Sequence, residues 1–216
     1  MQLTDTDICI LAGAGEDLSF DCALAMRYPC AIHIFDPTPR AIIHFEKLSA
    51  TVAAGKSFAP LSGEIDKREP YIINNEGFSR MFFHPYGLAA QDGEMRFYEP
   101  ANPEFVSHSI LNLHKTSQYF SAPVRRVSSI LNDFIGGRGR FALLKIDIEG
   151  AEYQVIEDMI TTQILPEILL VEFDEIHNPL DSAARDRIEH HIKMLQDASM
   201  RLIFTDVANM TFIKQR

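Results

Sequence analysis

Two carboxylates that directly follow a buried strand are the residues best placed to do chemistry. The run from Phe141 to Ile146 is almost entirely apolar, which is typical of a strand buried on both faces of a parallel sheet. Asp147 and Glu149 come next, and a helical pattern begins near Gly150. Ligands of open α/β sheets bind outside the carboxyl ends of the strands, so we expect a cofactor or substrate site around Asp147 and Glu149.

A second candidate site lies near the start of the chain, where the apolar run 8–12 ends in Gly13, Ala14 and Gly15. Glycine allows a tight turn and lets the backbone approach a ligand closely. An amphipathic helix is predicted directly afterwards, through residues 20–25. This order of strand, glycine turn and helix is typical of cofactor sites, although many such turns use glycine for geometry alone.

Asp36 ends the next predicted strand, 31–35, and stands 21 residues after Gly15. In nucleoside-binding sheets an acidic residue at this place accepts hydrogen bonds from ribose hydroxyls. The alternative is that Asp36 starts a turn before Pro37 and caps the following helix. Together with the glycine turn, the position favours the ribose role.

Another buried strand, 166–173, also ends in acids, Glu172 and Asp174, and His177 lies just beyond it. Asp147 is the first candidate for a general base, and Glu149, Glu172 and His177 are the reserve. The alternative for Glu149 is a cap on the helix after it. Two further charged residues in this part of the sequence, Glu152 and Lys145, are interpreted as structural. Glu152 is expected on the helix surface, and Lys145, inside an apolar strand, needs a carboxylate partner.

The elements alternate between strands and helices, which predicts a three-layer α/β domain over residues 1–216. We expect short strands at 71–73 and 80–84, separated by a turn at 74–77, then a hairpin of 86–90 with 94–98 across Gln91–Gly93. The polar, irregular stretch at about 99–122 is interpreted as an insertion on the substrate side. A strand and then a helix follow at 124–135. The chain closes with an antiparallel strand pair, 201–204 and 210–213.

The overall composition excludes several classes of protein. A net charge of -10 argues against a protein that binds nucleic acid through its phosphates. The cysteines are sparse and unpaired, which indicates a reducing, cytoplasmic setting and buried packing: Cys9, Cys22 and Cys30. No zinc-ligand spacing, signal peptide or membrane-spanning run is visible. We therefore predict no resident metal, and leave a divalent requirement and the oligomeric state open.

The closing hairpin resembles that of class I S-adenosylmethionine-dependent methyltransferases, and the segment Leu144–Glu152 resembles the most recognisable part of the FkbM family within that class. Weaker resemblances to the same family occur in the expected order along almost the whole chain. The segment 13–21 resembles a subgroup of the family whose first turn reads Gly-x-Gly-Glu-Asp. The other segments lie at 35–39, 87–93, 170–173 and 211–213.

The resemblance implies a mostly parallel seven-stranded sheet, S-adenosylmethionine as cofactor and oxygen methylation of a sugar or other small-molecule hydroxyl. It assigns the contacts with the cofactor as follows: Gly13, Ala14, Gly15, Glu16 and Asp17 for the methionine part, Asp36 for the ribose, Leu88 and Ala89 for the adenine, and Asp147 at the reacting end. One position departs from the pattern of many methyltransferases, because Leu11 stands where they have an acid. Glu16 or Asp17 is expected to substitute for it.

Two other functions compete with methyl transfer. A nicotinamide-dependent oxidoreductase would use the same glycine turn and Asp36, but the third glycine and a Tyr-x-x-x-Lys pair are missing. A non-catalytic module that binds a nucleoside or a protein partner would retain the fold without the chemistry.

Overall fold

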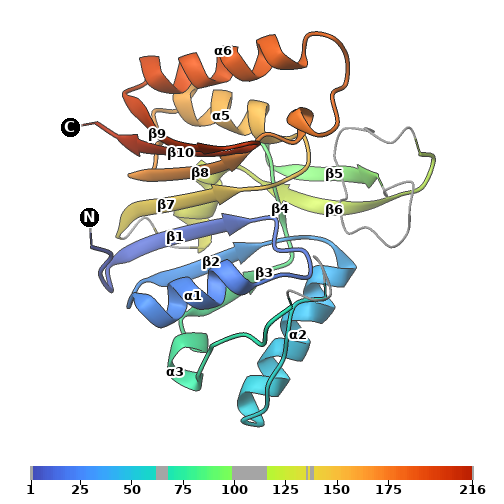
Figure 1. The fold of residues 1–216 in the computed structure, drawn as a ribbon, viewed down its shortest axis with the longest axis vertical. Helices are drawn as coiled ribbons and strands as arrows, with labels where there is room; N and C mark the ends of the chain where they lie inside the picture. Colours follow the sequence, from blue (N-terminus) through green and yellow to red (C-terminus); the bar gives the residue numbers. More distant parts are fainter. Residues whose placement is uncertain (1, 62–67, 99–115, 135, 137–138, 216) are drawn as a thin grey trace.

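The computed structural model describes residues 2–61, 68–98, 116–134, 136 and 139–215. Its main sheet has seven strands in the order β3-β2-β1-β7-β8-β10-β9 (Figure 1). Their bounds are β1 Asp7–Ala12, β2 Ala31–Phe35, β3 Met81–His84, β7 Arg140–Ile146, β8 Ile168–Glu172, β9 Met200–Asp206 and β10 Asn209–Lys214. The predicted three-layer α/β fold and its strands at 8–12, 31–35, 80–84, 141–146 and 166–173 are confirmed, with small shifts of the ends.

Strand β1 lies at the centre of the sheet, pairing in parallel with β2 on one side and β7 on the other. Strand β8 continues the parallel order beyond β7, and β10 then inserts antiparallel between β8 and β9. The predicted closing hairpin is therefore correct. Because all the parallel strands point the same way, the residues after β1, β2, β7 and β8 meet at one edge of the sheet.

Helices cover both faces of this sheet and bury two separate cores. Their bounds are α1 Ser19–Arg27, α2 Pro39–Ala53, α3 Asn75–Phe78, α4 Val127–Ser129, the π-helix η2 Ile130–Phe134, α5 Glu152–Thr161, the 3-10 turn η3 Asp174–Ile176 and α6 Ala184–Asp197. The first core packs α1 and α2 on β1 and β2, around Cys22, Leu48 and Ile34. The second packs η2, α5 and α6 on β1, β7 and β8, around Ile130, Ile156 and Leu195.

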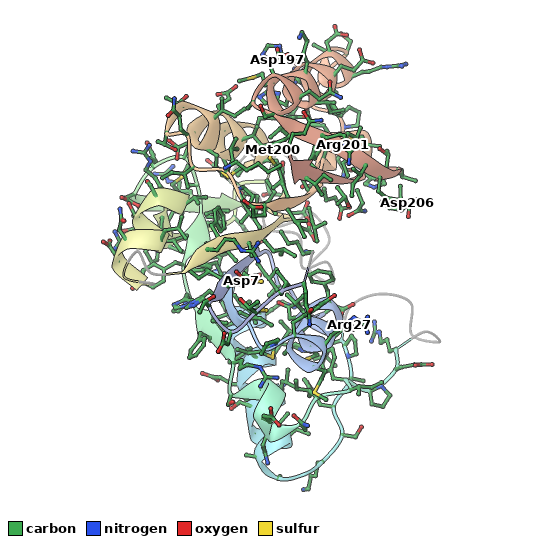
Figure 2. All side chains as sticks on the ribbon, turned by 90° about the vertical axis from the view of Figure 1, so that its left-hand side faces the viewer. Asp7, Arg27, Asp197, Met200, Arg201 and Asp206 are labelled. Atoms are coloured by element: carbon green, nitrogen blue, oxygen red, sulfur yellow. The ribbon has the colours of Figure 1, made fainter. Side chains whose placement is uncertain are left out.

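The edge opposite the carboxyl ends is formed by strand starts and helix ends. Figure 2 shows β1 starting at Asp7 and β9 starting at Met200, with α1 ending near Arg27 and α6 near Asp197. This is the arrangement expected when each helix returns the chain to the start of the next strand. Within the described ranges, no helix is long and apolar enough to cross a membrane.

A second, three-stranded sheet projects beyond the carboxyl ends of the main sheet (Figure 1). It consists of β4 Gly87–Leu88, β5 Gly93–Tyr98 and β6 Tyr119–Arg125, in the order β4-β6-β5. The predicted hairpin of 86–90 with 94–98 is wrong, because β6 lies between these strands, parallel to β4 and antiparallel to β5. The last residues of the predicted insertion at 99–122 belong to β6, which begins at Tyr119. Residues 99–115 of this insertion lie outside the described residues.

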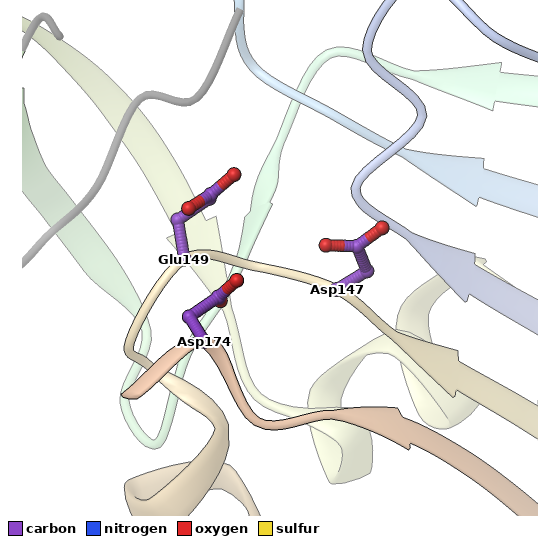
Figure 3. Close-up of side chains that lie close together, drawn as sticks. All are labelled: Asp147, Glu149 and Asp174. Atoms are coloured by element: carbon purple, nitrogen blue, oxygen red, sulfur yellow. The ribbon is translucent and has the colours of Figure 1, made fainter. Parts of the chain in front are cut away.

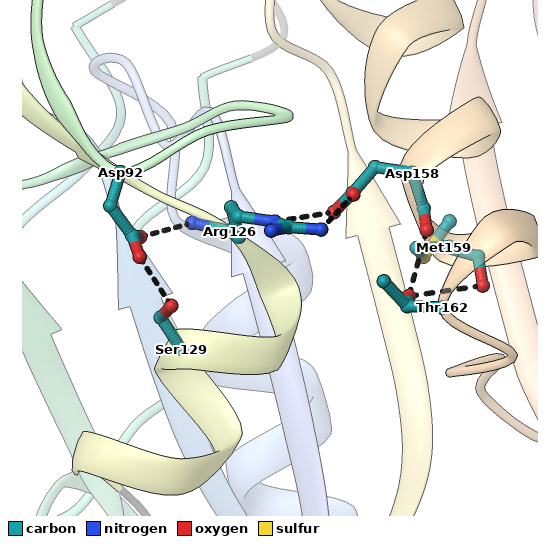
Figure 4. Close-up of polar contacts among 6 residues, drawn as sticks. All are labelled: Asp92, Arg126, Ser129, Asp158, Met159 and Thr162. Carbon is teal, nitrogen blue, oxygen red and sulfur yellow. Dashed lines mark hydrogen bonds and ion pairs between the residues drawn. The ribbon is translucent and has the colours of Figure 1, made fainter.

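Asp92 and Arg126 join the small sheet to the main one (Figure 4). Asp92 accepts hydrogen bonds from the Arg126 amide at 2.9 Å and the Ser129 hydroxyl at 2.5 Å. The Arg126 guanidinium binds the carboxylate of Asp158 in α5 through two nitrogens. The turn before β5 is thereby fixed to a helix of the main domain, which holds β4 and β5 close to the carboxyl edge.

The predicted strand at 71–73 is also wrong. Tyr71 is held by its side chain: its hydroxyl accepts from the Leu18 amide at 3.0 Å and lies 2.7 Å from His44 Nε2. Residues 71–73 belong to no strand of the described part of the chain, and Ile72 is 81% exposed. The turn expected at 74–77 is part of the short helix α3, which Asn74 caps by accepting from Gly77 N at 2.8 Å. The predicted helix in 124–135 is α4 continued by the π-helix η2.

Candidate active site

The glycine turn after β1 requires a residue without a side chain at its first position. Gly13 has a φ of +86°, and a Cβ there would lie 1.7 Å from the carbonyl oxygen of Asp147. The turn is held on both sides, since Gly13 N donates to Phe35 O at 3.0 Å and Asp147 N donates to Ala12 O at 3.1 Å. The two segments that carry the predicted site residues therefore touch through their backbones.

Asp36 supports this turn from the end of β2. Its Oδ2 accepts hydrogen bonds from Ala14 N and Gly15 N, both at 2.9 Å. Its Oδ1 accepts from the Thr38 amide at 2.8 Å and the Thr38 hydroxyl at 2.6 Å. The helix cap that we allowed for Asp36 is formed by Thr38, whose side chain accepts from Ala41 N. A ribose contact of Asp36 stays a prediction.

A cavity of about 420 Å³ opens beside the glycine turn. This volume is in the range of ordinary small-molecule sites, about 300–1,000 Å³. Most of the predicted residues lie in its wall: Gly13, Ala14, Gly15, Glu16, Asp17, Asp36, Leu88, Asp147 and Glu149. The end of β7, the glycine turn and the small sheet thus enclose one site.

Three predicted residues lie outside this wall. Ala89 is buried in a small apolar cluster with Phe97. Glu172 lines an adjacent, smaller cavity of about 180 Å³, together with Lys145 and Asp147. His177 is 3.9 Å from Glu172, measured from Nε2 to Oε1, with about half of its side chain exposed.

Asp21 is the cavity residue that the sequence interpretation missed. It lies in the first turn of α1, lines the cavity and is only 5% exposed. Its Oδ1 has no hydrogen-bond partner among the described residues. Burial raises the pKa of Asp21 to about 6, and the positive charge of Lys145 opposes that rise. Its sequence position inside an amphipathic helix gave no sign of this burial.

Lys145 has the carboxylate partner that its place in an apolar strand required. Its Nζ lies 3.2 Å from Asp147 Oδ2. Both side chains line the large cavity and the adjacent one. The pair therefore stands where a molecule in one cavity would meet a molecule in the other.

The amides of the loop after β7 are bound by Glu152, whereas the alternative that we allowed was a helix cap by Glu149. Glu152 is 1% exposed, so its expected place on the helix surface is wrong. Its carboxylate accepts from the amides of Ile148 and Gly150 at 3.0 to 3.1 Å. The helix begins at Glu152, and this residue binds the amides of the loop. Glu149 has a φ of +56°, an uncommon value for a residue with a side chain.

Asp174 joins these acids from η3, directly after β8. It is buried, and its Oδ2 has no hydrogen-bond partner among the described residues. Burial and the nearby carboxylates of Glu152, Glu149 and Asp147 raise the pKa of Asp174 to about 10. Burial likewise raises the pKa of Glu152 to about 7. We named Asp174 as an acid at a strand end but assigned it no role.

The sheet order, the antiparallel β10 and the site at the carboxyl edge define a Rossmann-like α/β fold of the class I methyltransferase type. The sequence model of the Methyltransferase FkbM domain matches residues 12–202. The chain belongs to this family of methyltransferases, as the residues 144–152 suggested. No curated protein matches the chain in a sequence comparison.

Solved structures with a similar fold include a methyltransferase FkbM from Methylobacillus flagellatus KT, with a TM-score of 0.55 and 12% identity. The match covers 99% of this chain and 44% of that one, so the chain spans less than half the length of this relative. A fibrillarin pre-rRNA processing protein from Methanococcus jannaschii has a TM-score of 0.48 and 8% identity, covering 98% and 67%. An Aeropyrum pernix fibrillarin with natively bound S-adenosyl-L-methionine has a TM-score of 0.48 and 7% identity, with the same coverage.

Proposed function

We propose that the protein is an S-adenosylmethionine-dependent O-methyltransferase that acts on a hydroxyl group of a sugar or another small molecule. Membership of the methyltransferase family supports the reaction class. The observation that carries the choice of cofactor is Asp21, a buried carboxyl group in the cavity wall with an oxygen that no described residue hydrogen-bonds. Burying such a group without a partner is costly, and a ligand with a positive charge would remove that cost.

Asp21 fits the ammonium group at the amino-acid end of the cofactor. The acid that many methyltransferases have before the glycine turn is replaced by Leu11, which is 2% exposed. The two substitutes expected from the sequence are already engaged: Glu16 binds Arg40 at 2.5 Å, and Asp17 accepts from Ser19 N at 2.8 Å. Asp21 therefore replaces them in the proposed ammonium contact.

The remaining contacts follow the cavity wall. Gly13 and Gly15 bring backbone close to the ligand, and Leu88, 3% exposed, offers an apolar surface for the adenine. Asp36 is proposed to bind the ribose while it holds the turn. Its four internal hydrogen bonds occupy its acceptor positions, so a ribose hydroxyl would share an oxygen with Thr38 or displace that hydroxyl.

Bound S-adenosylmethionine would supply a methyl group on a positively charged sulfur, for in-line displacement by the acceptor oxygen. Asp147 lines the cavity and is oriented by Lys145. We assign it the acceptance of the hydroxyl proton, with Glu149 as the neighbouring carboxylate. Holding the acceptor against the methyl group supplies much of the acceleration in such a displacement. Glu172, which lines the adjacent cavity, and His177, 3.9 Å from Glu172, would lie on the acceptor side.

Calorimetric titration with S-adenosylmethionine, its demethylated product and NAD tests the cofactor. We expect the first two compounds to bind and NAD not to bind. Asp21→Asn should weaken S-adenosylmethionine binding about tenfold or more, because it removes the charge opposite the ammonium. Asp186→Asn is the control, since Asp186 also lies in the first turn of a helix but is exposed. Binding of NAD alone would indicate an oxidoreductase, and binding of none of the three a non-catalytic module.

Turnover is tested with a panel of sugars, nucleotide sugars and phenols, scored by mass spectrometry for the gain of one methyl group. Asp147→Asn should keep the affinity for S-adenosylmethionine and lose about 10²- to 10⁴-fold in turnover. Wild-type turnover in this variant would remove Asp147 as the base. Methylation of amines but not of hydroxyls would overturn the choice of oxygen as acceptor.

A further inference from the structure

Three carboxyl groups from two strand ends converge beside the cavity. Asp147 and Glu149 follow β7, and Asp174 follows β8. Each offers one oxygen, and these three oxygens all lie within 4.8 Å of one another. Figure 3 shows the three side chains, with the carboxyl group of Asp174 directed toward the space between the other two. We call this group the acidic triad.

A second observation distinguishes the acidic triad from an ordinary cluster of surface acids. Asp174 is 6% exposed, and its Oδ2 has no hydrogen-bond partner among the described residues. Its carboxyl group also faces Glu152, another buried acid. Lys145 binds Asp147, with 3.2 Å between Nζ and Oδ2. A buried acid among other acids needs a proton or a positive charge, and the cation nearest to the group, Lys145, forms its ion pair with Asp147.

We propose that the acidic triad binds one hard divalent cation of the Mg²⁺, Mn²⁺ or Ca²⁺ class. Carboxylate oxygens are the ligands that these cations prefer. Two oxygens on opposite sides of Ca²⁺ lie about 5 Å apart, and ligands on adjacent sides lie closer. The oxygens of the acidic triad, all within 4.8 Å of one another, can therefore bind Ca²⁺ without rearrangement. The bonds to Mg²⁺ are shorter, so the three oxygens would have to move slightly closer together. This proposal departs from our prediction from sequence that the protein has no resident metal.

A shared proton explains less of the geometry than a cation does. A proton between Asp174 and Glu152 would satisfy one contact of Asp174. It would leave the convergence of Asp147 and Glu149 on the same space unexplained. A zinc ion is also a poorer fit, because structural zinc sites take sulfur and nitrogen ligands, and the triad offers only oxygen.

The place of the triad identifies a class of acceptor, and this step rests on the proposed function. Asp147 and Glu149 line the large cavity, whereas Asp174 is not part of its wall. A cation held by all three would therefore stand at the border of the cofactor site. Its open positions would take two neighbouring oxygens of the acceptor, as in a vicinal diol of a sugar, and a hydroxyl bound to a cation loses its proton more easily.

Titration with Mn²⁺, followed by the loss of its free electron paramagnetic resonance signal, tests the site directly. We expect one Mn²⁺ per wild-type chain, displaced by Mg²⁺ or Ca²⁺. Asp174→Asn should weaken binding at least about tenfold, and Asp186→Asn should not change it. Glu149→Gln is the second variant, since this partly exposed residue can change without disturbing a buried position. The absence of Mn²⁺ binding at millimolar concentration, or equal binding by both triad variants and the wild type, would overturn the proposal.

Binding of S-adenosylmethionine, measured on the same samples with a chelator present, separates this proposal from the proposed function. Cofactor binding without Mn²⁺ binding would refute the cation site and leave the methyltransferase function standing. Mn²⁺ binding without cofactor binding would support the cation site and refute the proposed methyltransferase function. If both hold, methylation of a vicinal diol should rise on addition of Mn²⁺ or Mg²⁺ more than methylation of an isolated hydroxyl; an equal rise would refute the assigned acceptor class.

Discussion

Asp36 and Asp174 are buried to nearly the same extent, with 5% and 6% of their surfaces exposed, yet their surroundings are opposite. Asp36 follows β2 and accepts four hydrogen bonds from the glycine turn and Thr38. Asp174 follows β8, faces other carboxylates, and has an oxygen with no hydrogen-bond partner among the described residues. Strands β1 and β7 separate the two acids in the sheet.

The comparison teaches that an acid at a strand end has no fixed role. Where backbone amides fill its acceptor positions, the acid supports the local structure and brings other groups to the ligand. Where the chain supplies no donor, the acid adds a cost that a proton, a cation or a ligand must remove. Asp21 belongs with Asp174 in this respect, since its Oδ1 also has no hydrogen-bond partner among the described residues.

The contact between the two halves of the site is the most sensitive to substitution. Gly13→Ala places a Cβ 1.7 Å from the carbonyl oxygen of Asp147, and backbone must move to admit it. We expect the free energy of unfolding to fall by about 3 kcal/mol or more, and S-adenosylmethionine affinity at least about tenfold. Gly55→Ala is the matched control, with a φ of +63° and no atom within 4 Å of the added Cβ. It should lose only about 1 kcal/mol in denaturant unfolding. Equal losses would mean that the close contact is not the cause.

The same substitution in the two buried acids should have unequal effects on stability. Asp36→Asn turns an NH₂ group toward the donors of the glycine turn or of Thr38, and should lower the free energy of unfolding by about 2–3 kcal/mol. Asp174→Asn replaces a buried carboxyl group, which its raised pKa keeps uncharged at neutral pH, by another uncharged group, and should change it by less than about 1 kcal/mol. Denaturant unfolding at neutral pH measures both. A similar loss in the two variants would contradict the distinction between the acids.

The sequence predicted the fold well because its signals are local. An apolar run that ends in acids or glycines marks a parallel strand and the edge where ligands bind, and this applied at Ala12, Phe35 and Ile146. The errors occurred where the partner is distant. The residues of β4 and β5 look like a hairpin, but β6, which begins at Tyr119, pairs with both.

The roles of single acids were harder to predict, because burial and donor supply depend on tertiary packing. Asp21 and Glu152 stand on helices in places that an isolated helix would expose, and both are buried by the sheet edge. Asp174 was recognised only as one acid at a strand end. Its approach to the loop after β7 depends on the pairing of β7 with β8, which single-sequence patterns do not give.

Asp21 also predicts a dependence of stability on pH. Its pKa is about 6 in the folded protein, above the ordinary value of 3.8, because it is buried. Between these two values the folded state binds more protons than the unfolded state, so the free energy of unfolding falls as pH rises from about 4 to 6, and this contribution is constant above that. The fall should amount to about 3 kcal/mol. The pKa of Asp7 is lowered by Arg140, so its stabilisation is lost only at more acidic pH.

Denaturant unfolding of the wild type and of Asp21→Asn between pH 4 and 7 measures the contribution of Asp21, as the difference between their free energies of unfolding. The difference should change with pH between 4 and 6 and then level off. A difference that is constant over this range would show that the carboxyl group of Asp21 does not titrate there. Saturating S-adenosylmethionine should stabilise the wild type more at pH 7 than at pH 5, because only the charged carboxylate binds the ammonium.

The smallest effect concerns Thr38, the residue with which a ribose would compete for Asp36. Thr38→Val removes the hydroxyl that donates to Asp36 Oδ1 at 2.6 Å and caps α2, and should lower the free energy of unfolding by about 1–2 kcal/mol. If a ribose hydroxyl takes this acceptor position, S-adenosylmethionine affinity should stay within about threefold of the wild type. Thr51→Val is the control, because its hydroxyl donates to Lys47 O in the same helix, away from the cavity. A large loss of affinity in Thr38→Val alone would mean that the hydroxyl of Thr38 is part of the binding surface and that Asp36 acts through it.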